Sequence, residues 1–80
     1  MDQITVYTKK RCPFCTSSKI WLKQRDYVFT EISLDVAEDL TKFITENPNL
    51  KSVPQIFLGD KLIGGFTELI ESELAASSVK

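Results

Sequence analysis

Cys12 and Cys15 are the side chains of this sequence whose type and spacing most directly suggest chemistry. They are its two cysteines, two residues separate them, and three consecutive cations at positions 9–11 precede them in the stretch "KKRCPFC". The sequence contains no histidine. A Cys-x-x-Cys pair can ligate a metal, form a structural disulfide or supply reactive thiols.

Metal ligation and structural cross-linking are both disfavoured for this pair. A closed zinc site needs four Cys or His ligands, and the sequence supplies two cysteines and no histidine. A disulfide that closes so short a loop removes little chain entropy, worth about 2 kcal/mol, and a reducing compartment would keep it open part of the time. We therefore favour the reactive interpretation.

The reactive interpretation gives the two thiols different roles. A thiolate is the nucleophile, and it is stabilised at a helix N-terminus and beside cations. Cys12 stands at the expected start of a helix, whereas Cys15 stands one turn further in. We therefore predict that Cys12 attacks a disulfide and that Cys15 resolves the mixed disulfide that results.

The elements around the cysteines can be predicted from the spacing of apolar residues. The stretch "ITVYT" at 4–8 is rich in β-branched residues and predicts a strand. A helical period runs from about Pro13 to Asp26, and alternation over 27–33 predicts a second strand. A Cys-x-x-Cys within such a strand–helix–strand unit is typical of redox-active pairs.

The second half of the sequence predicts another helix, a hairpin and a third helix. Asp35, with Glu38 three residues later, resembles a capping box, and Pro48 must end the helix that follows. The resulting order is β-α-β-α-β-β-α, with the first and third helices on one face of the sheet and the second on the other. The hairpin strands are expected at 55–58 and 61–64 around a turn at 59–60, and the third helix at 66–74.

Length and composition limit the classes of function. A length of 80 residues predicts a single domain over 1–80. The formal net charge of −1 disfavours nucleic-acid binding, which needs a surplus of positive charge. The sequence has no apolar run long enough for a membrane span and no export signal. We therefore expect a protein without nucleic-acid or membrane partners, located in the cytoplasm.

Two separated motifs resemble those of glutaredoxins. The stretch "YTKKRCPFC" at 7–15 resembles the strand end and active-site motif of that family, and "SVPQIFLGDKLIGGF" at 52–66 resembles its second signature. The resemblance runs from 4 to 74 with matching spacing. It implies a thioredoxin-like α/β fold in which three helices flank a four-stranded mixed sheet of order 2-1-3-4, and a cis peptide before Pro54.

The resemblance also implies an activity and its participants. Glutaredoxins are glutathione-dependent thiol–disulfide oxidoreductases that reduce protein disulfides and glutathione mixed disulfides through a Cys-x-x-Cys pair. It therefore implies glutathione as a co-substrate rather than a permanently bound cofactor, no metal, and clients that contain disulfides or are glutathionylated. A monomer is expected.

The glutathione contacts implied by the resemblance fall on both motifs. The backbone of Val53, beside Pro54, would pair with the cysteinyl backbone of glutathione, and Lys9 would meet a glutathione carboxylate. Phe14 would form an aromatic wall where the family usually has tyrosine, and Gly65 would let the chain approach the ligand closely. The implied set is Lys9, Phe14, Val53, Pro54, Gly65, Phe66 and Thr67.

The sequence departs from the family pattern after the glycine pair. Glutaredoxins commonly have a small residue and then an aspartate that holds the γ-glutamyl end of glutathione, whereas this sequence has Phe66, Thr67 and Glu68. Thr67 is expected to cap the third helix and to offer a ligand an uncharged hydrogen bond. Glu68 would replace the aspartate if its side chain turned inward.

Two other functions stay open at this stage. Phe66 resembles the residue found in glutaredoxin-like hydrogen donors that thioredoxin reductase recycles, for example for ribonucleotide reductase, although those proteins usually lack a residue such as Pro13. Some glutaredoxins instead bridge a [2Fe–2S] cluster between two chains through the first cysteine and glutathione. Pro13 and the available Cys15 argue against that use.

Overall fold

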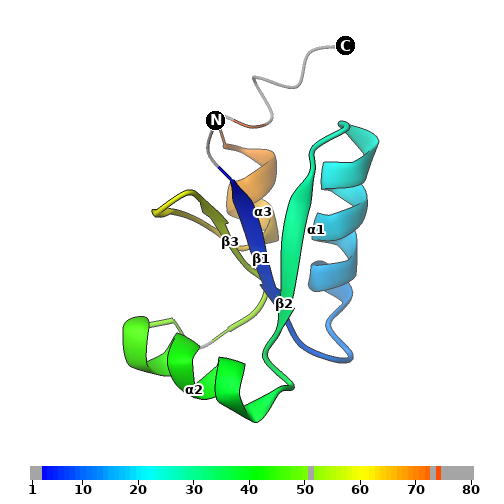
Figure 1. The fold of residues 1–80 in the computed structure, drawn as a ribbon. Helices are drawn as coiled ribbons and strands as arrows, with labels where there is room; N and C mark the ends of the chain where they lie inside the picture. Colours follow the sequence, from blue (N-terminus) through cyan, green and yellow to red (C-terminus); the bar gives the residue numbers. More distant parts are fainter. Residues whose placement is uncertain (1–2, 51, 73, 75–80) are drawn as a thin grey trace.

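A strand–helix–strand unit forms the first part of the fold. The computed structural model describes residues 3–50, 52–72 and 74. β1 (Ile4–Thr8) leads into α1 (Pro13–Gln24), and β2 (Phe29–Ser33) returns parallel to β1 (Figure 1). Proline suits the first turn of α1 because that turn leaves N–H groups unpaired in any case. The unit therefore places Cys12 at the N-cap of α1 and Cys15 in the first turn of that helix, as predicted.

The second strand begins two residues later than predicted. The N–H of Tyr27 bonds to the carbonyl of Leu22 at 3.0 Å, so Tyr27 takes part in the turn that follows α1 and is not yet in the strand. Asp26 has a φ of 62°, and this left-handed residue turns the chain back toward the sheet. Residues 27 and 28 therefore belong to the turn that ends the helix, although the alternating pattern of the sequence assigned them to the strand.

The second part of the chain completes the sheet. α2 (Ala37–Glu46) is followed by β3 (Gln55–Leu58), β4 (Lys61–Gly64) and α3 (Phe66–Ile70). β3 pairs antiparallel with β1, and β4 pairs antiparallel with β3, so the sheet order is β2-β1-β3-β4. The predicted element order and sheet order are confirmed.

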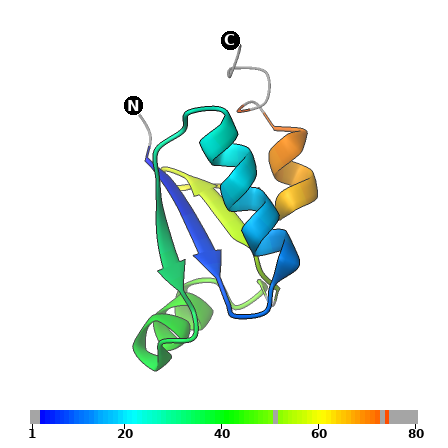
Figure 2. The ribbon, with the colours of Figure 1, turned by 90° about the vertical axis from the view of Figure 1, so that its right-hand side faces the viewer.

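The helices cover the two faces of the sheet unequally. α1 and α3 lie side by side on one face, and α2 lies on the other, near the ends of β1 and β2 (Figures 1 and 2). Under α1 and α3 the core includes Leu22 and Leu69, both fully buried. Under α2, the Tyr7 ring contacts the Phe43 ring with centroids 4.6 Å apart. None of the helices in the described ranges is long and apolar enough to cross a membrane.

The start of α2 differs from the prediction. Val36, not Asp35, occupies the N-cap, and a valine side chain cannot accept a hydrogen bond. The carboxylate of Asp35 instead accepts from the Lys10 N–H at 2.8 Å and from the Ser33 hydroxyl at 3.2 Å. The predicted capping box at Asp35 and Glu38 is therefore wrong, because a long-range partner competes for the cap side chain.

The third helix is shorter than predicted. α3 ends at Ile70 rather than at 74, and the N–H of Ser72 bonds to the carbonyl of Leu69 at 3.1 Å as the helix closes. Leu74 is nevertheless buried, and its carbonyl accepts from the Tyr27 hydroxyl at 2.7 Å. Position 74 therefore still packs on the core, but outside a continuous helix.

Candidate active site

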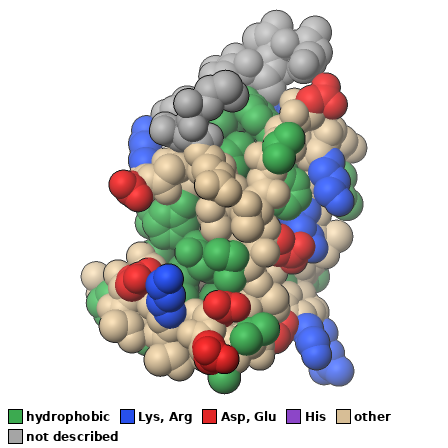
Figure 3. Space-filling model, in the orientation of Figure 1, with side chains coloured by type: hydrophobic (Ala, Val, Ile, Leu, Met, Phe, Trp, Pro, Cys, Tyr) green, Lys and Arg blue, Asp and Glu red, His purple; other side chains and the backbone are tan. Residues whose placement is uncertain are grey.

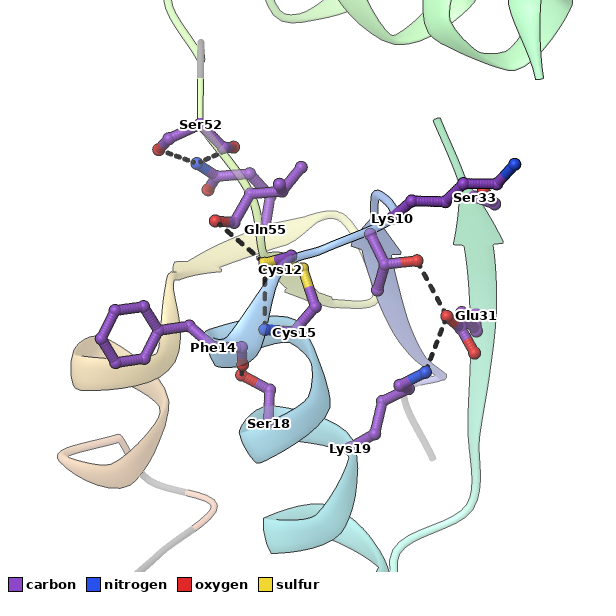
Figure 4. The surroundings of a disulfide bond; sticks show 12 residues. Lys10, Cys12, Phe14, Cys15, Ser18, Lys19, Glu31, Ser33, Ser52 and Gln55 are labelled. Carbon is purple, nitrogen blue, oxygen red and sulfur yellow. Dashed lines mark hydrogen bonds and ion pairs between the residues drawn. A yellow bond between two sulfur atoms is a disulfide. The ribbon is translucent and has the colours of Figure 1, made fainter. Parts of the chain in front are cut away.

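The two cysteines lie at the N-terminus of α1 in different surroundings. They are joined as a disulfide, with Cα atoms 5.2 Å apart (Figure 4). Cys12 is the N-cap residue and is partly exposed, whereas Cys15 is 2% exposed. Only Cys12 can therefore be approached from outside, which is consistent with the predicted order of attack.

Backbone groups surround the Cys12 sulfur. The Cys15 N–H donates to Cys12 Sγ at 3.1 Å, and the sulfur also lies 3.7 Å from the Val53 carbonyl oxygen. In the reduced protein, the N–H bond and the helix N-terminus both favour a negative charge on this sulfur. Both groups therefore favour the thiolate, which is the nucleophilic form of a cysteine side chain.

The three cations before Cys12 are less closely engaged. Lys9, Lys10 and Arg11 are all exposed, so salt screens their effect on the sulfur. The Lys10 side chain points away from the cysteines (Figure 4). Basic side chains gather over α1 and the loop before it, and several acidic ones lie over α2 (Figure 3). The cations thus supply a general positive field, and the N–H of Cys15 supplies the specific contact.

A polar groove of about 690 Å³ opens beside Cys12, between the active-site loop, α1 and β2. Within it the Glu31 carboxylate accepts from Lys19 Nζ at 3.0 Å and from the Thr8 hydroxyl at 2.8 Å. The Lys19 ammonium, and then the Thr8 hydroxyl, hold the pKa of Glu31 below its usual range. This bond set links β1, α1 and β2 next to the cysteines.

Two aromatic rings stand beside the cysteine pair. Phe14 points toward α3 (Figure 4), where its ring stacks on that of Phe66 with centroids 6.1 Å apart and an angle of 24°. Phe14 is 61% exposed despite this contact. Phe14 was predicted to form an aromatic wall, and Phe66 was identified as a departure from the family pattern; the structure brings the two rings together.

The residues before β3 complete the floor of the site. The peptide between Val53 and Pro54 is cis, which confirms what the family resemblance implied. Pro54 is buried and Val53 is partly buried. Val53 and Lys9 also line a second, apolar cavity of about 320 Å³ that extends toward α2. Lys9 therefore stands between the groove at Cys12 and this cavity.

The start of α3 lies close to Pro54. Gly65 is its N-cap, and a Cβ added there would meet the Pro54 carbonyl oxygen at 3.5 Å. The N–H of Gly65 donates to Glu68 Oε1 at 2.9 Å. Glu68 is therefore held in the first turn of its own helix rather than turned inward. Thr67 is exposed in that first turn but is not the cap, so the predicted capping role is wrong.

Some residues of the site were not predicted from the sequence. Gly64 has a φ of 123°, and a Cβ there would lie 2.8 Å from Glu68 Cγ, so it is this glycine that the turn requires. Glu31, Lys19 and Asp35 act through contacts distant in sequence, which local patterns do not report. The glycine pair at 64–65 was the only local sign of this turn, and the pair alone does not show which of the two glycines adopts the positive φ.

Comparison with known proteins places this geometry among relatives. A family model described as Glutaredoxin matches residues 4–63. Glutaredoxin 1 of Rickettsia felis is 35% identical over 75 residues, which cover 91% of this chain and 74% of that protein. The crystal structure of glutaredoxin 1 from Francisella tularensis, complexed with cacodylate, has a TM-score of 0.79 and 31% identity, and covers 95% of this chain and 96% of that one.

A further solved structure shares the fold alone. The glutaredoxin-like protein NrdH-redoxin from Escherichia coli has a TM-score of 0.72 at 21% identity, with 94% of this chain and 93% of that chain covered. That protein has a thioredoxin-like activity profile. Since proteins with different activity profiles share this backbone, the fold does not choose between them.

Proposed function

The chain belongs to the glutaredoxin family and is a thiol–disulfide oxidoreductase, and on that premise we propose that glutathione is its electron donor. Its substrates are protein disulfides and mixed disulfides between glutathione and proteins. One observation above all supports the thiol–disulfide exchange on which this proposal is built. The partly exposed Cys12 sulfur accepts a hydrogen bond from the Cys15 N–H at a helix N-terminus, directly beside the buried second thiol.

The first step forms a mixed disulfide. The Cys12 thiolate attacks one sulfur of the substrate disulfide, the S–S bond breaks, and the other substrate sulfur leaves as a thiolate that takes a proton from solvent. The Cys15 N–H and the helix N-terminus favour the thiolate before attack. Because Cys12 is exposed and Cys15 is buried, the substrate becomes linked to Cys12.

The second step depends on the substrate. With a protein disulfide, the Cys15 thiolate attacks Cys12 Sγ, so the protein client leaves with two thiols and the Cys12–Cys15 disulfide forms. A first glutathione thiolate then opens that disulfide and a second releases oxidised glutathione, which restores the dithiol. With a glutathionylated protein, Cys12 keeps the glutathione and one further glutathione releases it.

The proposed glutathione site follows the two motifs. The Val53 carbonyl oxygen is 3.7 Å from Cys12 Sγ, and this short distance supports pairing of the Val53 backbone with the cysteinyl part of glutathione. Lys9 stands beyond Val53 at the edge of the groove and would meet the glycine carboxylate. Thr67 and the N-terminus of α3 would face the γ-glutamyl end. Phe14 and Phe66 form an aromatic flank for the ligand.

A second candidate donor is thioredoxin reductase, and the stacked pair of Phe14 and Phe66 favours it. This pair makes the site more apolar than a usual glutathione pocket, and Thr67 lacks the charge of the usual aspartate. We rank glutathione first because the resemblance to glutaredoxins assigns glutathione contacts to Lys9 and Val53, and because the proteins recycled by thioredoxin reductase usually lack a residue such as Pro13. A monomer in the cytoplasm remains part of the proposal.

A coupled assay separates the two donors. The oxidised protein is reduced in the presence of NADPH with glutathione and glutathione reductase, and in parallel with thioredoxin reductase alone, while NADPH oxidation is followed. We expect turnover of bis(2-hydroxyethyl) disulfide in the first system and little in the second. Turnover in the thioredoxin reductase system alone would overturn the glutathione proposal and leave the oxidoreductase assignment intact.

A further inference from the structure

The apolar cavity beside Val53 is not used by the mechanism described above. It has a volume of about 320 Å³, and its walls come from α2 and from the segments on either side of that helix. Leu34, Leu40, Ile44 and Leu50 contribute hydrocarbon, and the buried Phe43 ring closes it toward the sheet. An open cavity of this size and lining suits an apolar group from a ligand.

The cavity adjoins the thiol site. Val53 lines it, and the carbonyl of the same residue lies 3.7 Å from Cys12 Sγ. Lys9 lines both the cavity and the groove around Cys12. A chain linked to Cys12 and lying along Val53 therefore reaches the cavity with its next residues.

Glutathione would leave this cavity empty in the proposed pose. Its carboxyl end points past Val53 toward Lys9, and that end is a glycine, which has no side chain to insert. A protein client linked to Cys12 in the same direction has a side chain on the carboxyl side of its cysteine. In this pose, a protein client can therefore fill the cavity with a side chain, whereas glutathione cannot.

We propose that this cavity is a specificity subsite that binds an aliphatic side chain on the carboxyl side of the client's reactive cysteine. The inference rests on the proposed function, since the direction of the client is taken from the glutathione pose. The Lys9 ammonium at the edge of the cavity disfavours a basic residue at the same place, because like charges repel. The preferred client therefore carries leucine, or a residue of similar shape, after its cysteine.

The effect on rate can be bounded. A hydrophobic pocket discriminates by roughly 10- to 200-fold for a change of one or a few methylene groups. The cavity is open to solvent on one side, so we expect the lower end, about tenfold, in the second-order rate constant for attack on the client disulfide.

The test uses symmetrical disulfides of three short blocked peptides. One peptide has leucine directly after its cysteine, one has leucine directly before it, and one has serine at both places. The protein is reduced beforehand and mixed with each peptide disulfide in a single turnover. Each protein molecule then gains the Cys12–Cys15 disulfide and releases two peptide thiols, so no other electron donor is needed. We expect the first peptide to react about tenfold faster than the other two.

Two matched variants locate the preference. Ile44 lines the cavity and is 52% exposed, and Val36 lies outside it in the same part of the fold and is 51% exposed. Because both side chains are about half exposed, we expect a polar replacement at either position to leave the core intact. I44Q should reduce the preference to about twofold or less, and V36Q should keep it. Neither variant should change the reduction of bis(2-hydroxyethyl) disulfide, which is too small to reach the cavity.

The outcomes separate the subsite from the function on which it rests. Equal rates for the three peptides, or a preference that survives I44Q unchanged, would overturn the subsite. An I44Q variant that loses rate equally on the peptides and on the small disulfide would overturn it as well. If the wild-type protein reduced the peptides but was not restored by glutathione, the glutathione proposal would fail and the measured peptide preference would still decide the subsite.

Discussion

Cys12 and Cys15 have the same side chain and differ in their surroundings. The Cys12 sulfur accepts a backbone N–H and can be reached from solvent, whereas Cys15 is packed behind it in the first turn of α1. A single N–H at a helix N-terminus is fixed by the backbone, so its effect on the thiolate does not depend on mobile side chains. The asymmetry between the two thiols is therefore a property of the helix start.

Thr67 is the residue at which the site departs most from its family. It is exposed in the first turn of α3 and carries no charge. We predict that T67D lowers the glutathione KM, because a carboxylate there would attract the γ-glutamyl ammonium group. An exposed ion pair contributes about 0.2–1 kcal/mol, so the fall should be up to about fivefold.

The control for this prediction places the same charge elsewhere. T41D adds a carboxylate on an exposed position of α2, and steady-state kinetics with varied glutathione compare the two variants. An unchanged KM in T67D, or an equal change in T41D, would show that position 67 does not face the γ-glutamyl group.

At the scale of elements, β1, α1 and β2 are joined by one carboxylate. Glu31 on β2 accepts from Thr8 on β1 and from Lys19 on α1, and these donors hold the pKa of Glu31 below its ordinary value of 4.5. A carboxyl group whose pKa is lowered on folding stabilises the fold above the unfolded pKa, and this contribution is lost as the pH falls through the folded pKa.

We predict that E31Q makes the stability of the protein less dependent on acid pH. The free energy of unfolding of the wild-type protein should fall as the pH drops below 4.5, and part of that fall should be absent in E31Q. Because the Glu31 side chain is 39% exposed, the effect is expected to be small. Urea unfolding at several pH values measures it, with E71Q on the surface of the molecule as the control. Parallel pH profiles for wild type and E31Q would contradict the prediction.

The order of the elements could be predicted from the sequence because periodicity is a local signal. The stretch "ITVYT", the helical spacing after Pro13 and the hairpin turn at 59–60 each report their own structure. The helix ends could not be predicted as well. Asp35 carries the sequence signal of a cap but bonds to Lys10, a residue 25 positions earlier, and no local pattern reports such a competitor.

The candidate site could be predicted only in part for the same reason. Cys12 and Cys15 follow from spacing, and the cis peptide at Pro54 followed from the family resemblance alone. The stacking of Phe14 on Phe66 required α1 and α3 to be placed side by side, which is a tertiary fact. Periodicity assigns each of these residues to an element but says nothing about distances between elements.

At the scale of the whole molecule, the core is small and depends on a five-residue helix. α3 buries Leu69 completely, next to Leu22 of α1 and Ile56 of β3. A domain of this length buries a limited share of the surface that its unfolded chain exposes. The loss of a single core side chain therefore removes a large fraction of its stability.

We predict that L69A lowers the free energy of unfolding by about 2–5 kcal/mol, which is the usual range for such a change in a core. Ile70, the next residue of the same helix, is 40% exposed, so I70A should cost about 1 kcal/mol or less. Urea unfolding followed by circular dichroism measures both variants. Equal losses would show that α3 is not anchored through Leu69.

The whole molecule presents its reactive sulfur between two apolar flanks. The Phe14 and Phe66 rings lie on the side of α3, and the cavity at Val53 lies on the side of α2. The two flanks belong to helices on opposite faces of the sheet, so the active-site edge is where the faces meet (Figure 2). In the proposed function, a client that spans this edge would contact both helical layers while Cys12 attacks.

The division of labour between the two thiols is the central claim, and comparing C12S with C15S tests it most directly. Each variant is assayed with glutathione and glutathione reductase on a glutathionylated peptide and, separately, on a protein disulfide. We expect C12S to lose both activities, and C15S to keep reduction of the glutathionylated peptide while losing most of its activity on the protein disulfide. Equal loss of both activities in the two variants would contradict the account.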